Sequence, residues 1–306
     1  MDISITIPNT NKKDFLRKCL CSLYEHTSGL NFEVIVIDNA STDGSAEMVE
    51  REFPDVRLIR NTERLGSSAN FNRGLRISKG KYWAVLHEDT MVTPGLFPQL
   101  VAFLNAHPEA GLIAPKSIFP DGSLDSSARK FPSLWGEILD GFFGRWIKPD
   151  LFYRYPEEQG DEPFQPDWIS ATCLIFRPKA LAEVGLFDEG FWIFYEETDL
   201  TYRLRRAGWQ VYMLPFVAVI HHRGVTSGQP VSPLVARHWL PSRYRFFRKH
   251  YGPKALLALR TVDCIVSLLR LVRWGLTWLR PERRVAAQAR MREYLTRLRM
   301  AVGIGE

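Results

Sequence analysis

The first half of the chain alternates short apolar runs with stretches of helical periodicity. Apolar and β-branched runs predict four strands, at 3–7, 32–37, 56–60 and 82–86. Apolar residues spaced three and four apart predict helices between them, at 15–24, 45–53 and 69–78. This alternation favours a mostly parallel, doubly wound α/β sheet. Such sheets bind ligands beyond the carboxyl ends of their strands, and Asp38 and the segment 87–89 fall there.

The pattern weakens between 121 and about 166, where aromatic residues, Pro and Gly dominate. This excursion either shapes an acceptor site or is a surface insertion without a role. Strand character returns at 168–177, and helices are predicted at 179–184 and 197–207. Two further strand runs, at 210–214 and 217–220, lead into His221 and His222.

The region 241–300 is predicted to be helical and basic. Between 255 and 280 the polar residues fall within about half of a helix circumference at 100° per residue. Charges recur too often for a transmembrane span, so the pattern favours an amphipathic helix at a membrane interface, with Trp274 and Trp278 as anchors. The alternative is that the apolar face docks on the catalytic domain.

The composition of the chain indicates which cellular compartment and which binding partners to expect. The 306 residues are 45% hydrophobic with a net charge of +6, which suits a large folded core and anionic partners such as phosphates, nucleic acid or an acidic membrane surface. The positive excess lies mainly in the Arg-rich C-terminal region. Four cysteines without a CxxC pair favour a reducing compartment, and no basic segment followed by an apolar one precedes the first strand. We therefore expect a cytoplasmic protein.

Carboxylates follow two of the predicted strands. Asp38 ends the second strand and opens a polar turn, where it can accept hydrogen bonds from a base or ribose; Asp43 suits a helix N-cap, and the whole turn is also explained as local capping. Glu88 and Asp89 are adjacent after the fourth strand. Two neighbouring carboxylates favour a divalent cation that bridges diphosphate oxygens, although a solvated acidic turn gives the same pattern.

Three carboxylates within four positions, Glu196, Glu197 and Asp199, follow a run of aromatic residues. A carboxylate in such apolar surroundings has a raised pKa and suits a general base. The alternative is that these charges complement the helix dipole. The pair His221-His222 could complete a metal or phosphate site, but adjacent histidines are more often incidental.

Taken in order, these segments resemble the inverting family 2 glycosyltransferases with the GT-A fold, and most closely their bacterial rhamnosyltransferase-like branch. The resemblance spans about residues 3–227. It rests on the order of many short runs: 38–44, Asn61 with Leu65-Gly66, 72–74, 87–90, 120–123, 167–170, 185–189, 196–200, 204–209 and 221–224.

The resemblance implies a GT-A catalytic domain over 1–230, with a nucleotide-sugar half at about 1–120 and an acceptor half at about 121–230. Residues 231–306 would form a basic, helical, possible membrane-associating region. It further implies a nucleotide-diphosphate sugar donor, with a leaning to dTDP-rhamnose, a glycan or lipid-linked acceptor at the inner leaflet, and no nucleic acid partner.

The same resemblance implies roles for individual residues. The nucleotide would contact Pro8, Asn9, Asp38, Asn39, Gly66 and Asn72. A Mg²⁺ or Mn²⁺ ion would be held by Asp89, Glu88 and His222, or less readily by His221. Trp168 and Asp199 would lie near the donor sugar or acceptor. Glu197, with Glu196 beside it, would take the proton of the acceptor hydroxyl in a single displacement that inverts the anomeric carbon.

Three departures from the family pattern stand out. Asn9-Thr10-Asn11 replaces Thr-Tyr-Asn, His87 and Glu88 replace the usual residues before the metal-binding Asp, and Glu197 replaces an Asp base. Two alternatives stay open: a nucleotidyltransferase, against which the missing glycine-rich phosphate loop counts, and a non-catalytic membrane-surface protein on the same fold.

Overall fold

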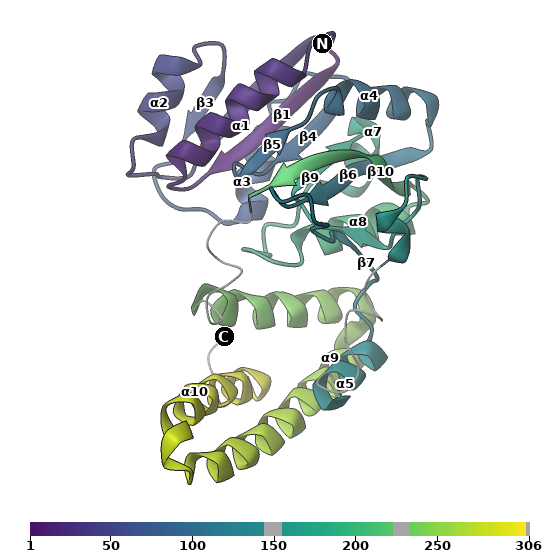
Figure 1. Cartoon of the computed structure of the whole chain (residues 1–306). Coiled ribbons are helices and arrows are strands. Elements are labelled where there is room, and N and C mark those ends of the chain that lie inside the picture. The colour runs from purple at the N-terminus through teal and green to yellow at the C-terminus, as the bar shows by residue number, and fades with distance from the viewer. Residues whose placement is uncertain (144–154, 223–232, 304–306) are drawn as a thin grey trace. The chain divides into compact units, whose positions relative to one another are not determined.

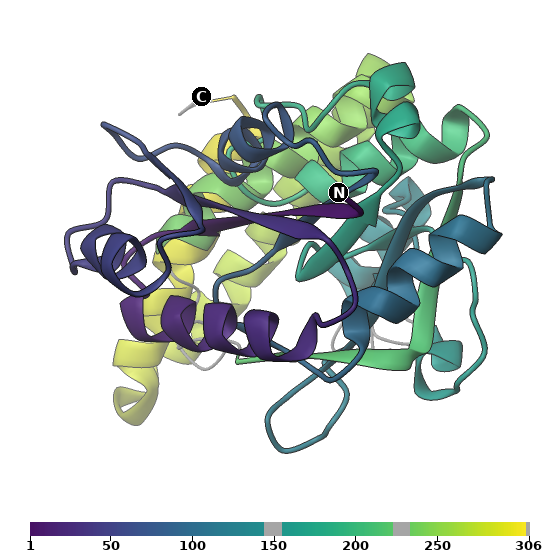
Figure 2. The same cartoon turned by 90° about the horizontal axis from the view of Figure 1, so that it is seen from above.

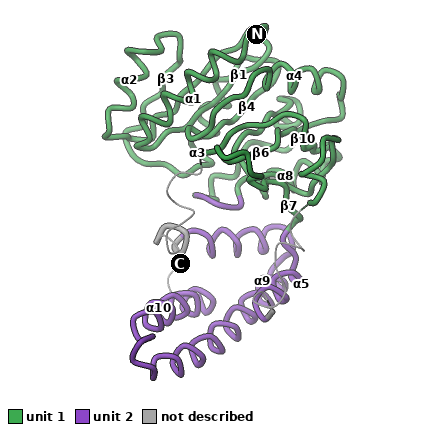
Figure 3. The backbone as a smooth tube through the Cα atoms, viewed as in Figure 1, with its two compact units in different colours: residues 1–131, 154–192, 196–228 green, residues 132–153, 193–195, 229–306 purple. Residues whose placement is uncertain are grey.

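The computed structural model describes residues 1–143, 155–222 and 233–303, and the chain forms two compact units. Unit 1 comprises 1–131, 154–192 and 196–228 (Figure 3). Unit 2 comprises 132–153, 193–195 and 229–306. The segment 132–153, which the sequence places in an acceptor half, thus clusters with the C-terminal helices.

Unit 1 is built on an eight-stranded sheet with the order β3-β2-β1-β4-β9-β6-β10-β5. Its strands are β1 Ile3–Asn9, β2 Phe32–Asp38, β3 Arg57–Arg60, β4 Tyr82–Leu86, β5 Thr90–Val92, β6 Ala110–Ile118, β9 Cys173–Phe176 and β10 Gln210–His221. The pairs β3–β2, β2–β1, β1–β4 and β6–β10 are parallel, and the other three pairs are antiparallel. The predicted mostly parallel α/β sheet is confirmed.

Helices cover both faces of this sheet (Figures 1 and 2). Side chains from α1 (Lys13–His26), α2 (Ser45–Glu52) and α4 (Leu96–Ala106) share a buried cluster with one face. Those from α3 (Ser67–Leu75), α7 (Pro178–Val184) and α8 (Glu196–Arg206) pack against the other. The alternation of strand side chains supplies both cores: Ala84 and Leu86 of β4 join the first cluster, and Val85 joins the second.

Two parts of unit 1 differ from the sequence prediction. The predicted strand 168–177 is divided by a turn: β8 (Trp168–Ile169) pairs with β7 (Ala128–Arg129), whereas β9 enters the main sheet. The elements β5, α4 and β6 lie in 90–118, where no element is predicted. Helix α4 is apolar on most sides and β6 contains Gly111 and Pro115, so neither shows a clear periodicity.

Unit 2 is helical, with α5 (Leu134–Phe143), α9 (Pro233–Trp278), a short 3-10 turn at Pro281–Arg283 and α10 (Arg284–Ala301). Arg243 is buried and its guanidinium lies 2.6 Å from the Glu137 carboxylate and 2.8 Å from that of Asp263. These ion pairs tie α5 to both halves of α9. No helix in the described ranges is both long enough and apolar enough to cross a bilayer.

Asp43 anchors the starts of two helices in unit 1. Its carboxylate accepts hydrogen bonds from the backbone N–H of Lys13, at 2.9 Å, and of Ser45, at 3.0 Å, which begin α1 and α2. These N–H groups have no partner within their own helices, so a side-chain acceptor stabilises both ends. Asp43 therefore accepts from the first residue of both helices, although the N-cap positions themselves are occupied by Lys12 and Gly44 and not by the predicted Asp43.

We expect Asp43→Ala to lower the free energy of unfolding by about 1–2 kcal/mol, because both helix starts lose their acceptor. Urea unfolding followed by circular dichroism measures the change. The exposed Asp55, replaced by Ala, is the control and should leave the midpoint unchanged. Equal midpoints for both variants would contradict the double cap.

Candidate functional site

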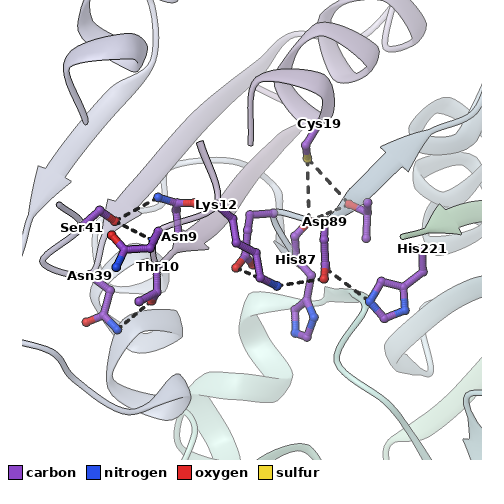
Figure 4. A network of polar contacts seen from close by, with 12 residues as sticks. Asn9, Thr10, Lys12, Cys19, Asn39, Ser41, His87, Asp89 and His221 are labelled. Carbon is purple, nitrogen blue, oxygen red and sulfur yellow. Dashed lines mark hydrogen bonds and ion pairs between the residues drawn. The ribbon is translucent and has the colours of Figure 1, made fainter. Parts of the chain in front are cut away.

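Two strand ends bring three potential metal ligands together in unit 1. His87 and Asp89 follow β4, and His221 is the last residue of β10, where it pairs with Thr90 of β5. Ligand atoms of His87, Asp89 and His221 all lie within 4.8 Å of one another (Figure 4). The backbone N–H of His87 is held by Thr172 O at 3.0 Å, so this cluster is fixed on neighbouring strands.

The charge of Asp89 is balanced by two cationic groups. The ammonium of Lys12 lies 2.9 Å from Asp89 Oδ2 and 3.3 Å from Glu88 Oε1, and His221 Nε2 lies 3.3 Å from Asp89 Oδ1. Burial by itself raises the pKa of Asp89, but the hydrogen bond from His221 and the interactions with neighbouring His87 and with the charge of Lys12 outweigh it and hold the pKa far below its usual range. Asp89 is therefore an ionised, buried carboxylate.

The two imidazoles of the cluster differ in protonation. Burial lowers the pKa of His87 to about 4, so its ring is neutral at pH 7. Burial also lowers the pKa of His221, but hydrogen bonds to Asp125 and Asp89 outweigh this and raise it to about 9. A cation at Asp89 would take the place of the His221 proton, because a metal ligand must present a free lone pair.

Asp125 orients the ring of His221. Its Oδ2 lies 2.8 Å from His221 Nδ1, and because a carboxylate only accepts hydrogen bonds, Nδ1 must carry the proton. Nε2 is then the atom directed at Asp89. Asp125 is itself bonded by Ser117 Oγ at 3.2 Å, and the next residues are held by the buried Glu158, which accepts from Ser126 Oγ at 2.7 Å and Ser127 N at 2.6 Å. This is the outer-shell arrangement found around metal-binding histidines.

This donor set fits a divalent cation. One ionised carboxylate and two imidazoles, one of them oriented by a second carboxylate, offer oxygen and nitrogen ligands to the same point. Mg²⁺ prefers oxygen ligands throughout, whereas imidazole is a ligand for transition metal ions.

Glu196 and Glu197 begin α8 in apolar surroundings. Burial raises the pKa of Glu197 to about 7, against hydrogen bonds from its own N–H and that of Ala171. Burial and the charge of Glu197 raise the pKa of Glu196 well above its ordinary value. Only about 5% of Glu196 is exposed, whereas Glu197 is half-buried, so Glu197 is the more accessible of the two carboxyls. A carboxyl that titrates near neutrality suits a general base.

A single turn joins this carboxyl to the metal-ligand cluster. In the segment 170–172, Ala171 donates its N–H to Glu197, and Thr172 accepts the N–H of His87. The turn exists because β8 and β9 belong to different sheets. The interruption of the predicted strand therefore positions both parts of the candidate site.

The backbone before α8 is also unusual. Phe194 and Tyr195 both adopt left-handed conformations, with φ of 70° and 69°, which side-chain-bearing residues rarely do. Strain of this kind is commonly found at functional sites, and here it immediately precedes the two glutamates.

Asn9 and Asp38 lie side by side at the carboxyl ends of β1 and β2, where they pair in register. Asp38 Oδ2 accepts the N–H of Ser41 at 3.2 Å, and Asn9 Nδ2 donates to Ser41 Oγ at 3.1 Å. Among the described residues, nothing donates to the buried Asp38 Oδ1 or Asn9 Oδ1. Buried acceptors that lack a donor are suited to a ligand with N–H groups.

Other predicted nucleotide contacts are used within the fold. Asn39 Oδ1 accepts from Leu65 N at 2.7 Å, and Asn72 exchanges hydrogen bonds with Phe187 at 2.8 and 3.0 Å. Gly66 leaves room for the Trp192 backbone, with which a side chain there would collide. Pro8 is half-buried on β1. Asn39 and Gly66 therefore shape the loop after β3, and Asn72 anchors α3.

The predicted sugar-site residues also have structural partners. Asp199 is fully buried and its carboxylate lies 2.8 Å from Arg203, whose guanidinium bonds three backbone carbonyls of 184–186. It holds α7 to α8. Trp168 donates its indole N–H to Lys130 O at 3.0 Å while remaining partly exposed.

The observed metal-ligand cluster differs from the predicted one at two residues. His222 follows the last residue of β10, and its side chain has other partners: its Nε2 lies 3.1 Å from Met91 Sδ and its ring packs on Phe15. The structure therefore brings His221, and not His222, to Asp89. Glu88 faces Lys12 and lies outside the cluster. Arg223 and Gly224, which complete the histidine motif, lie outside the described residues.

Three residues of the site are absent from the sequence prediction: Lys12, His87 as a ligand, and Asp125. Lys12 directly follows the loop after β1 and is the first of two adjacent lysines, and this pair of cations near a strand end is the available signal. Asp125 lies 96 positions from His221, and nothing in their local sequences connects them.

Comparison with known proteins agrees with this geometry. The family model described as "Glycosyl transferase family 2" matches residues 4–183. An N-acetylglucosaminyl-diphospho-decaprenol L-rhamnosyltransferase of Mycobacterium tuberculosis is 32% identical over 234 residues, covering 72% of this chain and 76% of that protein. The chain therefore belongs to glycosyl transferase family 2 and is a glycosyltransferase.

Solved structures support the GT-A fold. The mannosyltransferase PcManGT of Pyrobaculum calidifontis, in complex with GDP-Man and Mn²⁺, has a TM-score of 0.60 at 16% identity, over 99% of this chain and 88% of that one. GalNAc-T7 with UDP, GalNAc and Mn²⁺ has a TM-score of 0.57 at 17% identity, over 72% of this chain and 44% of that one. At these identities the likeness shows the fold alone.

We expect Asp125→Asn to weaken Mn²⁺ binding by about 10–100-fold, because an amide can donate as well as accept and no longer fixes the His221 tautomer. Calorimetric titration of the metal-free protein with Mn²⁺ measures this. Asp121→Asn, an exposed change in the same segment, is the control and should bind as the unaltered chain does. Equal Mn²⁺ affinity in a folded Asp125→Asn protein would remove Asp125 from the site.

Proposed function

We propose that the chain transfers a rhamnosyl group from dTDP-rhamnose to a lipid-linked glycan acceptor, with inversion at the anomeric carbon. The observation that carries the proposal is the pairing of a carboxyl that titrates near neutrality, Glu197, with a carboxylate–imidazole cluster held by the same turn. A glycosyl transfer of this kind needs a base for the incoming oxygen and charge stabilisation for the leaving diphosphate.

In this proposal Asp89, His221 and His87 would hold a divalent cation, with Mn²⁺ favoured over Mg²⁺, and neither Glu88 nor His222 would be a ligand. The bound cation would neutralise charge on the leaving nucleotide diphosphate. Lys12, which bonds Asp89 and Glu88, adds a second positive charge at the same strand edge. The Mn²⁺ in the two structural relatives supports this choice.

Asp38 and Asn9 would recognise the base of the donor. Their side-by-side acceptor oxygens suit the ring N–H that uracil and thymine share. The leaning to a dTDP donor and to rhamnose rests on the family resemblance and on the name of the mycobacterial relative. Unit 1, which contains most of 1–230, would be the catalytic domain.

Glu197 would accept the proton of the attacking hydroxyl, since burial raises its pKa to about 7, and Glu196 would lie beside it as the more buried member of the pair. Trp168, partly exposed on β8, would border the sugar or acceptor. Because the deprotonated carboxylate is the active form, catalysis requires a pH near or above the pKa of Glu197.

The proposed acceptor and the proposed cellular location of the enzyme are both inferred from the name of the mycobacterial relative. Its name specifies a lipid-linked diphosphate sugar, which would place the reaction at a membrane surface. All four cysteines are free thiols, which suits a reducing compartment. We therefore propose a cytoplasmic enzyme, peripheral on the inner leaflet.

Donor binding tests the metal and nucleotide assignments. We expect dTDP to bind in the presence of Mn²⁺ and to lose about tenfold or more in affinity with EDTA or in Asp89→Ala. Isothermal calorimetry with dTDP and UDP provides the measurement, and the tighter nucleotide identifies the donor series. Metal-independent binding of equal strength would contradict the assigned ligands.

Replacement of the proposed base tests the chemistry. We expect Glu197→Gln to lower kcat by about 10²–10⁴-fold while nucleotide affinity is unchanged. In the unaltered enzyme, kcat/KM should fall about tenfold per pH unit below a pKa of about 7, as Glu197 becomes protonated.

Glu196→Gln is the matched comparison. It changes the neighbouring carboxyl, which is less accessible, and should retain most of kcat. If Glu196→Gln were the more damaging change, the two assignments would be exchanged. If neither change affected kcat, the base would lie elsewhere.

A further inference from the structure

The second half of α9 exposes a continuous apolar stripe. Gly252, with a φ of 86°, ends the first half of the helix, and Pro253 begins the second, where its missing N–H costs nothing. Seven large apolar side chains on or just after this half are 44–68% exposed: Leu257, Ile265, Leu268, Leu269, Val272, Leu276 and Leu279. At 100° per residue they span about 120° of the circumference, over roughly 33 Å.

The other side of the same helix is packed within unit 2. A side chain on Gly141 of α5 would come within 3.1 Å of Val266 and 3.7 Å of Val262. Ser267 and Leu259 are buried, and Asp263 pairs with Arg243. The side with Asp263 and Ser267 therefore faces its own unit while the apolar stripe is exposed, the reverse of an ordinary surface helix. Exposed apolar surface of this extent marks an interaction site.

The charge around the stripe is strongly positive. Residues 254–303 contain eleven Lys and Arg but three carboxylates. Asp263 is paired with Arg243, and Glu293 with Arg290 and Arg297, which leaves Glu282 as the exposed acid of this described region. Arg273 and Arg280 are exposed along one border of the stripe. A second copy of the chain would bring these like charges together, whereas an anionic surface complements them.

We propose that this stripe is a membrane-binding surface, which lies in the interface of a bilayer that contains anionic phospholipid. The apolar side chains enter the acyl boundary, and the neighbouring arginines contact the phosphates. The proposal rests on the proposed function only in that a lipid-linked acceptor lies in the same interface. It does not depend on the sugar or on the metal.

The two tryptophans expected from the sequence as anchors differ in exposure. Trp274 is half-buried and falls on the packed side of the helix, whereas Trp278 is 38% exposed and its ring lies 5.1 Å from the guanidinium of Arg284. Most of the exposed apolar surface therefore comes from the leucine-rich stripe, and Trp278 stays available beside it.

Vesicle sedimentation tests the proposal with the full chain. We expect it to bind vesicles of phosphatidylcholine mixed with phosphatidylglycerol, and to bind phosphatidylcholine alone far less. The triple change Leu268→Ser, Val272→Ser and Leu276→Ser should weaken binding to the anionic vesicles by about tenfold or more. Arg273→Gln with Arg280→Gln should reduce both that binding and its sensitivity to salt.

Phe216→Ser is the control, because Phe216 is an apolar residue of unit 1 that is 43% exposed, and its change should not affect vesicle binding. Circular dichroism and calorimetric dTDP binding show that each variant is folded, and they report on the donor site separately from lipid. Unchanged vesicle binding in the folded triple variant, or no binding by the unaltered chain, would overturn the proposal. So would a dimer in lipid-free buffer that the triple change abolishes, since the stripe would then be covered by a second copy.

Discussion

Charge compensation at Asp89 is the constraint around which unit 1 is organised. A carboxylate that is about 5% exposed at a strand end requires positive partners, and it receives them from separate parts of the chain. Lys12 comes from the loop after β1, and His221 from the end of β10. The three meet because β1, β4 and β10 end at related edges of one sheet. The topology of unit 1 thus brings Asp89 and its two cationic partners together from segments that are distant in the sequence.

The oriented histidine extends this organisation outward. Asp125 fixes the ring of His221, Ser117 holds Asp125, and Glu158 secures the backbone that follows. Each residue in this series of contacts is a buried polar group that is hydrogen-bonded by another member of the series or by the backbone next to it. Buried networks are costly when incomplete, so the loss of one member would affect the geometry at Asp89 without touching a ligand.

The sequence predicts the parts of the fold whose signals are local. The β-branched strands, the amphipathic helices and the positions of Asp38, Asp89 and Glu197 at element ends all follow from periodicity and motif order. It fails where the deciding interaction is distant: contacts across the sheet distinguish His221 from His222, and the pairing of β8 with β7 creates the turn at 170–172. Helix α4 was missed because a helix buried on several sides has no polar face to reveal its period. Asp125 belongs to no recognisable motif, and it contacts His221 only because the sheet brings these two distant segments together.

The ammonium of Lys12 has a consequence for how a cation could enter and leave. Because Lys12 already lies 2.9 Å from Asp89, the carboxylate has a counter-charge before any metal arrives. A divalent cation bound at Asp89 would therefore compete with Lys12 for the same carboxylate, and the exchange would replace one counter-charge by another. A site of this kind would suit an ion that binds and leaves together with the nucleotide.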